Sequence, residues 1–346
     1  MLPAITESAP LAPLTTLGLG GAARFFAEIT EGVQVASALA WATERNLPVF
    51  VLGGGSNLVV ADAGFGGLVL RIRTRGLTWR ELDGELRVEA QAGEPWDDIV
   101  AAAVAHDAAG IECLSGIPGS AGAAPVQNIG AYGQEVGSVI RQVRVLERKS
   151  LEVSFLDASA CGFGYRDSIF KQQPDRFVIL GLTLGLTQHG APVLRYPELA
   201  TTLPGRPSVA DVRAAVLALR RTKSMVLDES DPNRRSAGSF FTNPIVTTEV
   251  ADRLARVAEA MPRFPLPDGR VKLPAAWLIE HAGLPRGFRM GPVGISSRHA
   301  LALVHHGGGK TNDLLRLALH VHESVRERFG ISLVPEPVFL GLVWPA

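Results

Sequence analysis

The sequence lacks the features that mark nucleic-acid-binding, membrane-spanning or secreted proteins. Its 346 residues carry 34 basic and 34 acidic side chains, so the formal net charge is zero. A broad basic surface that could neutralise a nucleic-acid backbone is therefore not expected. No run approaches the ~20 apolar residues of a membrane span, and the first residues, MLPAITESAP, lack the basic-then-apolar pattern of a secretory signal. We predict a cytoplasmic monomer whose partner is a small molecule, with no nucleic acid and no membrane involved.

Cysteine is scarce, and the histidines do not have the spacing of metal ligands. Cys113 and Cys161 lie far apart without a C-x-x-C pattern, so we interpret them as small buried residues of a reducing compartment. Four histidines near the C-terminus form two close pairs whose members stand one or two residues apart, and such neighbours do not converge on one ion; they are His305, His306, His320 and His322. We predict no metal site.

Two glycine-rich fragments look like nucleotide-binding motifs but lack the context those motifs need. Residues 18–23 fit G-x-G-x-x-A, yet no strand precedes them and no helix follows directly, as a Rossmann site would require. Residues 305–311 end in Gly-Lys-Thr, but Val304 occupies the position of the first P-loop glycine. We interpret the second fragment as a glycine-rich turn before a helix whose N-cap is Thr311.

The hydrophobic pattern predicts a mixed α and β chain with a domain border near residues 200–215. Ser208 and Asp211 are typical of a helix N-terminus, and Pro-Glu-Pro at 335–337 should confine the last strand to a sheet edge. We predict helices over 31–47, 96–109, 209–221, 248–261, 274–282 and 311–329, and strands over 48–52, 67–72, 85–90, 140–146, 151–155, 176–186 and 331–343. The segment 188–207 is rich in turn residues.

Three segments are difficult to explain by packing alone. Residues 51–58, VLGGGSNL, lead a strand into three glycines, which would let consecutive backbone N–H groups approach a phosphate. Residues 115–133 offer bare backbone and a few side-chain amides that could hold a pyrophosphate or a flavin ring. Residues 237–244, AGSFFTNP, place Ser239 in a turn of small residues beside two aromatic residues. Alone, the second segment could be a structural crossover, and Ser239 could be an ordinary turn residue.

In this order, and together with residues 162–170 and 334–337, these segments resemble the UDP-N-acetylenolpyruvoylglucosamine reductase family, longer subclass. The resemblance covers nearly the whole chain. It implies an α+β fold with a two-part FAD-binding domain of the vanillyl-alcohol-oxidase (PCMH) type and a separate α+β substrate-binding domain. The domain limits that follow are 1–205 for the FAD-binding domain (about 1–75 and 76–205), 206–330 for the substrate-binding domain, and 331–346 for a C-terminal strand that returns to the active site.

The resemblance also implies the residues of the site. The family's essential arginine corresponds to Arg166, its proton-donating serine to Ser239 and its active-site glutamate to Glu336. Substrate-binding positions are Tyr132, Tyr196, Lys223, Asn243 and Lys272. Non-covalent FAD would be bound by Gly53, Gly54, Gly55, Ser56, Asn57, Leu58, Pro118, Gly119, Ser120, Gly122, Ala123, Gln127, Asn128, Ile129, Gly130, Ala131, Tyr132 and Gly133.

The activity implied is the NADPH-dependent, FAD-mediated reduction of UDP-N-acetylglucosamine enolpyruvate to UDP-N-acetylmuramate, a step in peptidoglycan precursor synthesis. Two alternatives remain open. The chain could be another flavin-dependent oxidase of the same fold, or a non-catalytic nucleotide-binding protein in which Arg166 and Glu336 form a structural ion pair. The segment 225–235, MVLDESDPNRR, departs from the family pattern by being longer and more charged.

Overall fold

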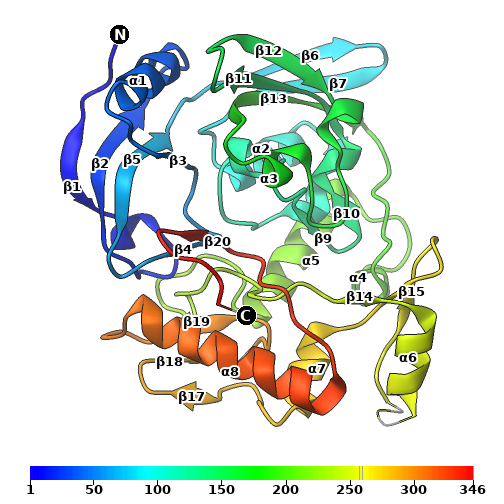
Figure 1. Ribbon diagram of the computed structural model, residues 1–346. Coiled ribbons are helices and arrows are strands. Elements are labelled where there is room, and N and C mark those ends of the chain that lie inside the picture. The colour runs from blue at the N-terminus through cyan, green and yellow to red at the C-terminus, as the bar shows by residue number, and fades with distance from the viewer. Residues whose placement is uncertain (257, 259, 346) are drawn as a thin grey trace. The chain divides into compact units, whose positions relative to one another are not determined.

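The computed structural model describes residues 1–256, 258 and 260–345, and its contacts divide the chain into two compact units (Figure 1). The first unit contains Met1–Ala9, Ala23–Gly55 and Phe65–Leu227. The second contains Pro10–Ala22, Ser56–Gly64 and Asp228–Ala346. The glycine motif is thus shared, because Gly55 ends a segment of the first unit and Ser56 begins one of the second.

The first unit begins with a four-stranded sheet in the order β1-β2-β5-β3. Its strands are β1 (Thr6–Pro10), β2 (Ala22–Ile29), β5 (Phe65–Ile72) and β3 (Val49–Leu52). Strand β5 runs parallel to both β2 and β3. Helix α1 (Val33–Thr43) connects β2 to β3 and buries Val35, Ala38, Leu39 and Ala42, as its 3.6-residue period requires. The end of β3 delivers the chain to Gly53.

A second sheet of the first unit is antiparallel and contributes many residues to its core. Its path is β12 (Val153–Asp157), β11 (Ile140–Glu147), β13 (Phe177–Gln188), β7 (Glu85–Gln91) and β6 (Leu77–Leu82), and β8 (Ala108–Ala109) pairs with the end of β13. Strand β7 alternates between buried and half-buried positions, with Leu86, Val88 and Ala90 buried. A small hairpin joins β9 (Gly130–Ala131) to β10 (Gln134–Glu135).

Four further helices complete the first unit. They are α2 (Trp96–Ala105), α3 (Ile169–Gln172), α4 (Pro197–Thr202) and α5 (Val209–Thr222), with short 3-10 turns at Glu112–Leu114, Ala121–Ala123, Val136–Ser138 and Ala158–Cys161. Ser208 and Asp211 form a complete capping box at the start of α5. The predicted N-cap at Ser208 is therefore confirmed.

The second unit is built around α8 (Thr311–Phe329), whose buried face includes Leu314, Leu317, Val321 and Val325. Its other helices are α6 (Thr248–Ala255) and α7 (Ala275–His281), with a 3-10 turn at Ala12–Leu14. Three small sheets accompany them: β14 (Ile245–Val246), β16 (Val271–Lys272) and β15 (Phe264–Pro265); β17 (Arg289–Met290), β18 (Val293–Ile295) and β19 (Leu303–His305); and β20 (Val338–Leu340) with β4 (Leu58–Val60). Strands β4 and β20 are parallel, red against blue in Figure 1.

Several predicted elements have different limits in the structure. The predicted helix 96–109 ends at Ala105, because Ala108 and Ala109 pair with β13 instead. The predicted strand 331–343 shrinks to Val338–Leu340, which begins directly after Pro337. The predicted helix 248–261 ends at Ala255, and its positions 257 and 259 lie outside the described residues. The turn-rich segment 188–207 contains α4, which the prediction missed.

Thr311 is not the N-cap of α8, contrary to the prediction. Lys310 is the N-cap and Thr311 is the first helical residue. The Thr311 hydroxyl donates to the carbonyl of Val60 at 2.6 Å, so it serves a long-range contact and not the helix end. Asp62 accepts the N–H group of Thr311, which has no acceptor within the helix, at 2.7 Å.

Candidate active site

In the first unit, the glycines after β3 lie directly against the loop at Gly119 and Ser120. A Cβ on Gly54 would lie 2.6 Å from the Cα of Gly119, and one on Gly53 would lie 2.7 Å from the Oγ of Ser120. Only glycine tolerates such an approach of backbone to backbone. The Oγ of Ser120 is buried and has no hydrogen-bond partner among the described residues. Bare backbone beside an unsatisfied hydroxyl fits a bound phosphate or flavin, so these residues suit FAD.

Asn128 fastens the second half of this loop. Its side-chain amide donates to a carboxylate oxygen of Glu135 and to the carbonyl of Gly164, both at 2.9 Å. Its Oδ1 accepts the N–H of Gly137 at 2.8 Å. The residue is buried and has φ +43°, a conformation that asparagine tolerates better than most residues. Asn128 therefore connects the predicted cofactor loop to the segment that carries Arg166.

Arg166 has a left-handed backbone and an anchored guanidinium. Its φ is +52°, which costs a non-glycine residue about 1–3 kcal/mol. The guanidinium donates from Nη2 to the carbonyl of Gly130 at 2.8 Å, and the carbonyl of Arg166 accepts from the ammonium of Lys171 at 2.8 Å. These two contacts help to hold the backbone of Arg166 in a left-handed conformation that an isolated arginine would disfavour. Strain of this kind is found most often where a side chain must point in one functional direction.

Three of the predicted substrate-binding residues meet in the first unit. The rings of Tyr132 and Tyr196 pack edge to face with centroids 5.3 Å apart, and the Lys223 ammonium lies 5.9 Å from the Tyr132 ring centroid. Lys223 also pairs with Glu198 at 2.9 Å. Burial alone would lower the pKa of Lys223, but the hydrogen bond that its ammonium donates to Glu198 and the field of Tyr132 outweigh burial, so the pKa of Lys223 is raised. Burial raises the pKa of Tyr132, against the opposing field of Lys223. Lys223 is thus a fixed cation beside two aromatic rings.

No sequence pattern indicates the ion pair that holds the start of the 115–133 loop. Asp97, in the first turn of α2, accepts from both Nη atoms of Arg213 on α5 at 2.7 and 2.8 Å. The same carboxylate accepts the N–H of Gly116 at 2.6 Å. Burial would raise the pKa of Asp97, but these donors more than offset it, so its pKa is held below the ordinary value. A partner so distant in sequence leaves no local pattern to recognise.

In the second unit, Ser239 and Glu336 lie on neighbouring segments. The N–H of Glu336 donates to the carbonyl of Phe240 at 2.8 Å, and Phe241 forms a bridge with Pro335. The side-chain amide of Asn57 donates to the carbonyl of Glu336 at 3.3 Å. The last strand is thus attached on one side to the serine motif and on the other to the end of the glycine motif. Arg166 belongs to the first unit.

A histidine that the sequence prediction missed accompanies Ser239. The hydroxyl Oγ of Ser239 lies 3.3 Å from Nε2 of His299, and both side chains are half-buried. Because His299 stands between Arg298 and Ala300 and belongs to no recognisable motif, only the fold reveals the pair.

The remaining predicted substrate contacts in this unit are Asn243 and Lys272. The Oδ1 of Asn243 accepts the N–H of Ala275 at 2.9 Å at the start of α7, and Lys272 pairs with Ile245 across β16 and β14. Leu58 is buried at the beginning of β4. Asn243 therefore has a structural contact of its own, since its side chain accepts a hydrogen bond from the first residue of α7.

Comparison with known families agrees with this arrangement. Residues 23–151 match the model described as "FAD binding domain", and residues 231–340 match the model described as "UDP-N-acetylenolpyruvoylglucosamine reductase, C-terminal domain". A protein named UDP-N-acetylenolpyruvoylglucosamine reductase in Thermobifida fusca is 46% identical and the match covers 99% of each chain. A protein of the same name in Streptomyces avermitilis is 48% identical over 97% of this chain and 95% of its own. This chain belongs to the UDP-N-acetylenolpyruvoylglucosamine reductase family.

A solved reductase confirms the fold. The enzyme of that name from Thermus caldophilus superposes with a TM-score of 0.69 at 25% identity, covering 98% of this chain and 100% of its own. The predicted resemblance, the α+β fold with an FAD-binding domain of the PCMH type and the FAD cofactor are confirmed.

The described residues contain no candidate membrane span and no candidate metal cluster. Within residues 1–256, 258 and 260–345, no helix combines the length and the apolar character needed to cross a membrane. Within the same residues, no three His, Cys, Asp or Glu side chains gather as metal ligands would.

Proposed function

We propose that this reductase converts UDP-N-acetylglucosamine enolpyruvate to UDP-N-acetylmuramate in peptidoglycan precursor synthesis, with NADPH as reductant and with Arg166, Ser239 and Glu336 as its catalytic residues. Family membership over the full length supports the reaction. The observation that best supports the residue roles is that the Ser239 segment and Glu336 are joined by the Phe240–Glu336 hydrogen bond. This backbone hydrogen bond places the residue after Ser239 next to the residue that corresponds to the family's active-site glutamate, which is not expected of a serine in an ordinary surface turn.

The substrate is a vinyl ether conjugated to a carboxylate, so its reduction is a conjugate addition. Hydride reaches the terminal carbon, and negative charge develops at the adjacent carbon and spreads into the carboxylate. FAD, held by the glycines at 53–55 and the loop at 118–133, would supply the hydride-transfer chemistry that links NADPH to the substrate. The protein must bind both molecules, stabilise the enolate and deliver one proton.

Arg166 stabilises the carboxylate as it gains enolate character. Its permanent charge and planar fork suit a carboxylate, and its fixed backbone keeps the guanidinium in position before the reaction. Glu336 helps this enolate only when it is protonated or bridged to it by a hydrogen-bond donor, since a bare carboxylate would repel the enolate. We therefore expect the pKa of Glu336 to be raised when substrate is bound.

Ser239 gives its hydroxyl proton to the carbanion. The O–H bond of Ser239 breaks as the new C–H bond forms, and solvent returns the proton to the serine. A serine hydroxyl is a weak acid in water, but the acceptor here is strongly basic and geometry selects the donor.

The binding residues form two groups, one for FAD and one for the substrate. The glycines at 53–55 and the loop at 118–133 hold FAD, and the side chains of Tyr132, Tyr196, Lys223, Asn243 and Lys272 hold the substrate. The ordered cation at Lys223 supports a contact with the diphosphate. The domain limits 1–205, 206–330 and 331–346, the cytoplasmic location and the monomeric state belong to the same proposal.

Ser239→Ala tests the proton-donor role by separating the two half-reactions. Reduction of the flavin by NADPH should be nearly unchanged, whereas reoxidation of the reduced flavin by the substrate should slow by about 10²–10⁴-fold. Ser154→Ala, at an exposed position of β12, is the matched control and should leave both steps unchanged. Equal loss in both half-reactions of Ser239→Ala would show that Ser239 is not the donor.

The two alternatives give different spectra. A flavin oxidase would be reoxidised by oxygen and not by the enolpyruvyl ether, and a non-catalytic protein would not be reduced by NADPH.

A further inference from the structure

We propose that His299 is a positioning residue for Ser239, and that Asp231 and Asn233 hold the turn that carries it. The inference rests on the proposed role of Ser239. All of these residues belong to the second unit, so the geometry that supports it lies within one compact body.

The direction of the Ser239–His299 hydrogen bond follows from the role of the serine. A hydroxyl has one hydrogen and two lone pairs. If that hydrogen is aimed at the substrate carbon, the contact with Nε2 at 3.3 Å can exist only with the ring nitrogen as donor. His299 therefore carries its proton on Nε2, fixes the rotation of the hydroxyl and stabilises the alkoxide that remains after proton transfer.

Ser239 and His299 are held together by the backbone as well. The N–H of Phe240, next to Ser239, donates to the carbonyl of Leu301 at 2.7 Å. The carbonyl of His299 accepts the N–H of Ala302 at 3.0 Å, and Ser296 donates its N–H to the carbonyl of Ala302 at 2.8 Å. The turn from Ser296 to Ala302 is thus closed on itself and attached to the serine motif.

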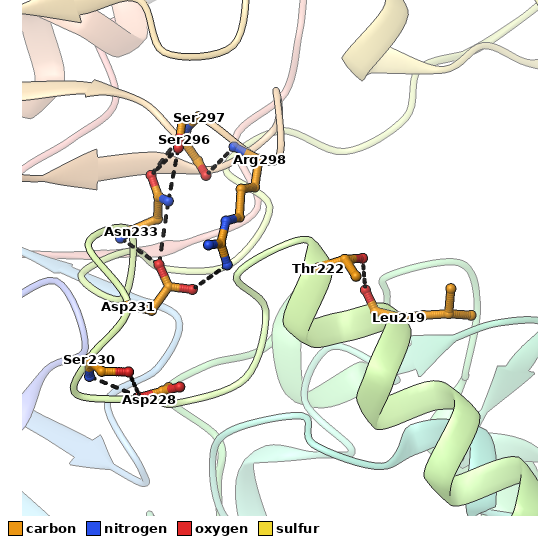
Figure 2. Close-up of polar contacts among 9 residues, drawn as sticks. All are labelled: Leu219, Thr222, Asp228, Ser230, Asp231, Asn233, Ser296, Ser297 and Arg298. Carbon is orange, nitrogen blue, oxygen red and sulfur yellow. Dashed lines mark hydrogen bonds and ion pairs between the residues drawn. The ribbon is translucent and has the colours of Figure 1, made fainter.

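The other side of this turn contacts two residues of the segment 225–235, Asp231 and Asn233 (Figure 2). The Oδ1 of Asn233 accepts the N–H of Ser297 at 3.1 Å, and its amide donates to the Ser297 hydroxyl at 3.1 Å. Asp231 accepts the N–H of Asn233 at 2.8 Å and pairs with Arg298 at 3.5 Å. Asp231 and Asn233 are buried, whereas the partner side chains on the turn reach the surface.

Buried polar groups of this kind are costly unless they are satisfied, so they specify one arrangement of the backbone. The segment 225–235 thereby gains a function. Its Asp231 and Asn233 fix the position of His299, and His299 fixes the hydroxyl of Ser239.

The first test compares His299→Ala with His299→Gln in single-turnover measurements. His299→Ala should slow reoxidation of the reduced flavin by substrate about 10–100-fold, the effect of one lost hydrogen bond to a group that becomes charged. Reduction by NADPH should not change. His299→Gln should recover most of the rate, because its amide can also donate to Oγ. His320→Gln, at an exposed position of α8, is the matched control.

A double substitution decides whether His299 acts through Ser239. In a Ser239→Ala background, His299→Ala should cause no further loss, since there is no hydroxyl left to position. Independent losses that multiply would overturn the inference. If the wild-type flavin is restored by the substrate and Ser239→Ala is slow, but His299→Ala is as fast as wild type, the inference fails while the proposed function stands. If substrate does not restore the wild-type flavin, the proposed function itself fails.

Asn233→Ala tests the contacts that hold the turn. It should slow the same step and leave the NADPH step intact, with Asn312→Ala, exposed at the start of α8, as its control. Ser297→Ala removes one hydroxyl from the same network and serves as the milder variant if Asn233→Ala does not fold. Unchanged substrate reduction in the folded variant would overturn this part of the inference.

Discussion

The side-chain amide of Asn57 donates a hydrogen bond to the backbone carbonyl of Glu336, 279 positions later in the chain. The same Asn57 accepts the N–H of Val338 through its own carbonyl at 3.0 Å, at the point where β4 and β20 begin to pair. The end of the glycine motif and the last strand therefore fix the backbone on both sides of Pro337. The position of Glu336 depends on a segment that the sequence places among the cofactor contacts.

Glu336→Gln and Glu336→Ala should differ in substrate reduction. If Glu336 acts as a neutral carboxylic acid, glutamine preserves an uncharged hydrogen-bonding group of similar size, whereas alanine removes it. We expect Glu336→Ala to be slower by about 10²–10³-fold, the effect of losing one donor to developing charge, and Glu336→Gln to retain at least a tenth of the wild-type rate. Stopped-flow reoxidation of the reduced flavin by substrate measures both. A carboxyl that ionises well below neutral pH in the substrate complex would contradict this role.

Gly54→Ala should impair FAD retention. The added Cβ would meet the backbone of Gly119 at 2.6 Å, and neither backbone can yield as a flexible side chain could. Gly66→Ala is the control, because a Cβ there meets nothing within 4 Å. The ratio of flavin to protein absorbance after gel filtration should fall for the first variant and remain unchanged for the second. Full flavin content in Gly54→Ala would mean that this approach of the two loops is not needed.

Arg166→Lys should retain the charge but lose most of the catalytic effect. Lysine lacks the planar fork, so it cannot contact the carbonyl of Gly130 and a substrate carboxylate with the same geometry. Substrate reduction should slow by about 10²–10³-fold with an unchanged NADPH step. Arg45→Lys, on the surface after α1, provides the comparison. An Arg166→Lys enzyme within threefold of wild type would show that charge alone suffices.

Asp97→Asn should destabilise the protein in a pH-dependent way. The folded pKa of Asp97 is below its ordinary value of 3.8, so its contribution is fully present above that value and is lost as the pH falls through the folded pKa. Because the carboxylate is partly exposed, we expect Asp97→Asn to lower the free energy of unfolding by about 1–2 kcal/mol at pH 7, the lower part of the range for charged hydrogen bonds.

Urea unfolding at pH 7 and at pH 3 measures the difference in the free energy of unfolding between the wild type and Asp97→Asn. This difference should be smaller at pH 3 than at pH 7. Asp175→Asn removes an exposed partner of Arg148 and should cost less than about 1 kcal/mol at either pH. Equal effects of the two substitutions at pH 7 would contradict the account of Asp97.

A feature of the fold could be predicted from the sequence when the residues that contact each other lie close together in the chain. The cap at Ser208 and Asp211 was predictable because both partners lie in one turn. Thr311 looked equally suitable as a cap, but its hydroxyl is engaged by Val60, a residue 251 positions away. The glycines at 53–55 are conspicuous in the sequence, and the structure places Gly53 and Gly54 where the close approach of Ser120 and Gly119 leaves no room for a side chain.

The contacts that orient the site were not predictable in the same way. The Asp97–Arg213 pair and the Ser239–His299 pair join segments that become neighbours only after folding. Asp, Arg and His are also common on surfaces, so nothing in their local sequence distinguishes these copies.

The central claim is tested most directly by the absorbance spectrum of the purified protein, followed without oxygen as NADPH and then UDP-N-acetylglucosamine enolpyruvate are added. The account predicts a yellow protein that NADPH bleaches and that this substrate restores to the oxidised spectrum. A flavin that bleaches but is restored only by oxygen would contradict it, as would a protein that cannot be reconstituted with FAD.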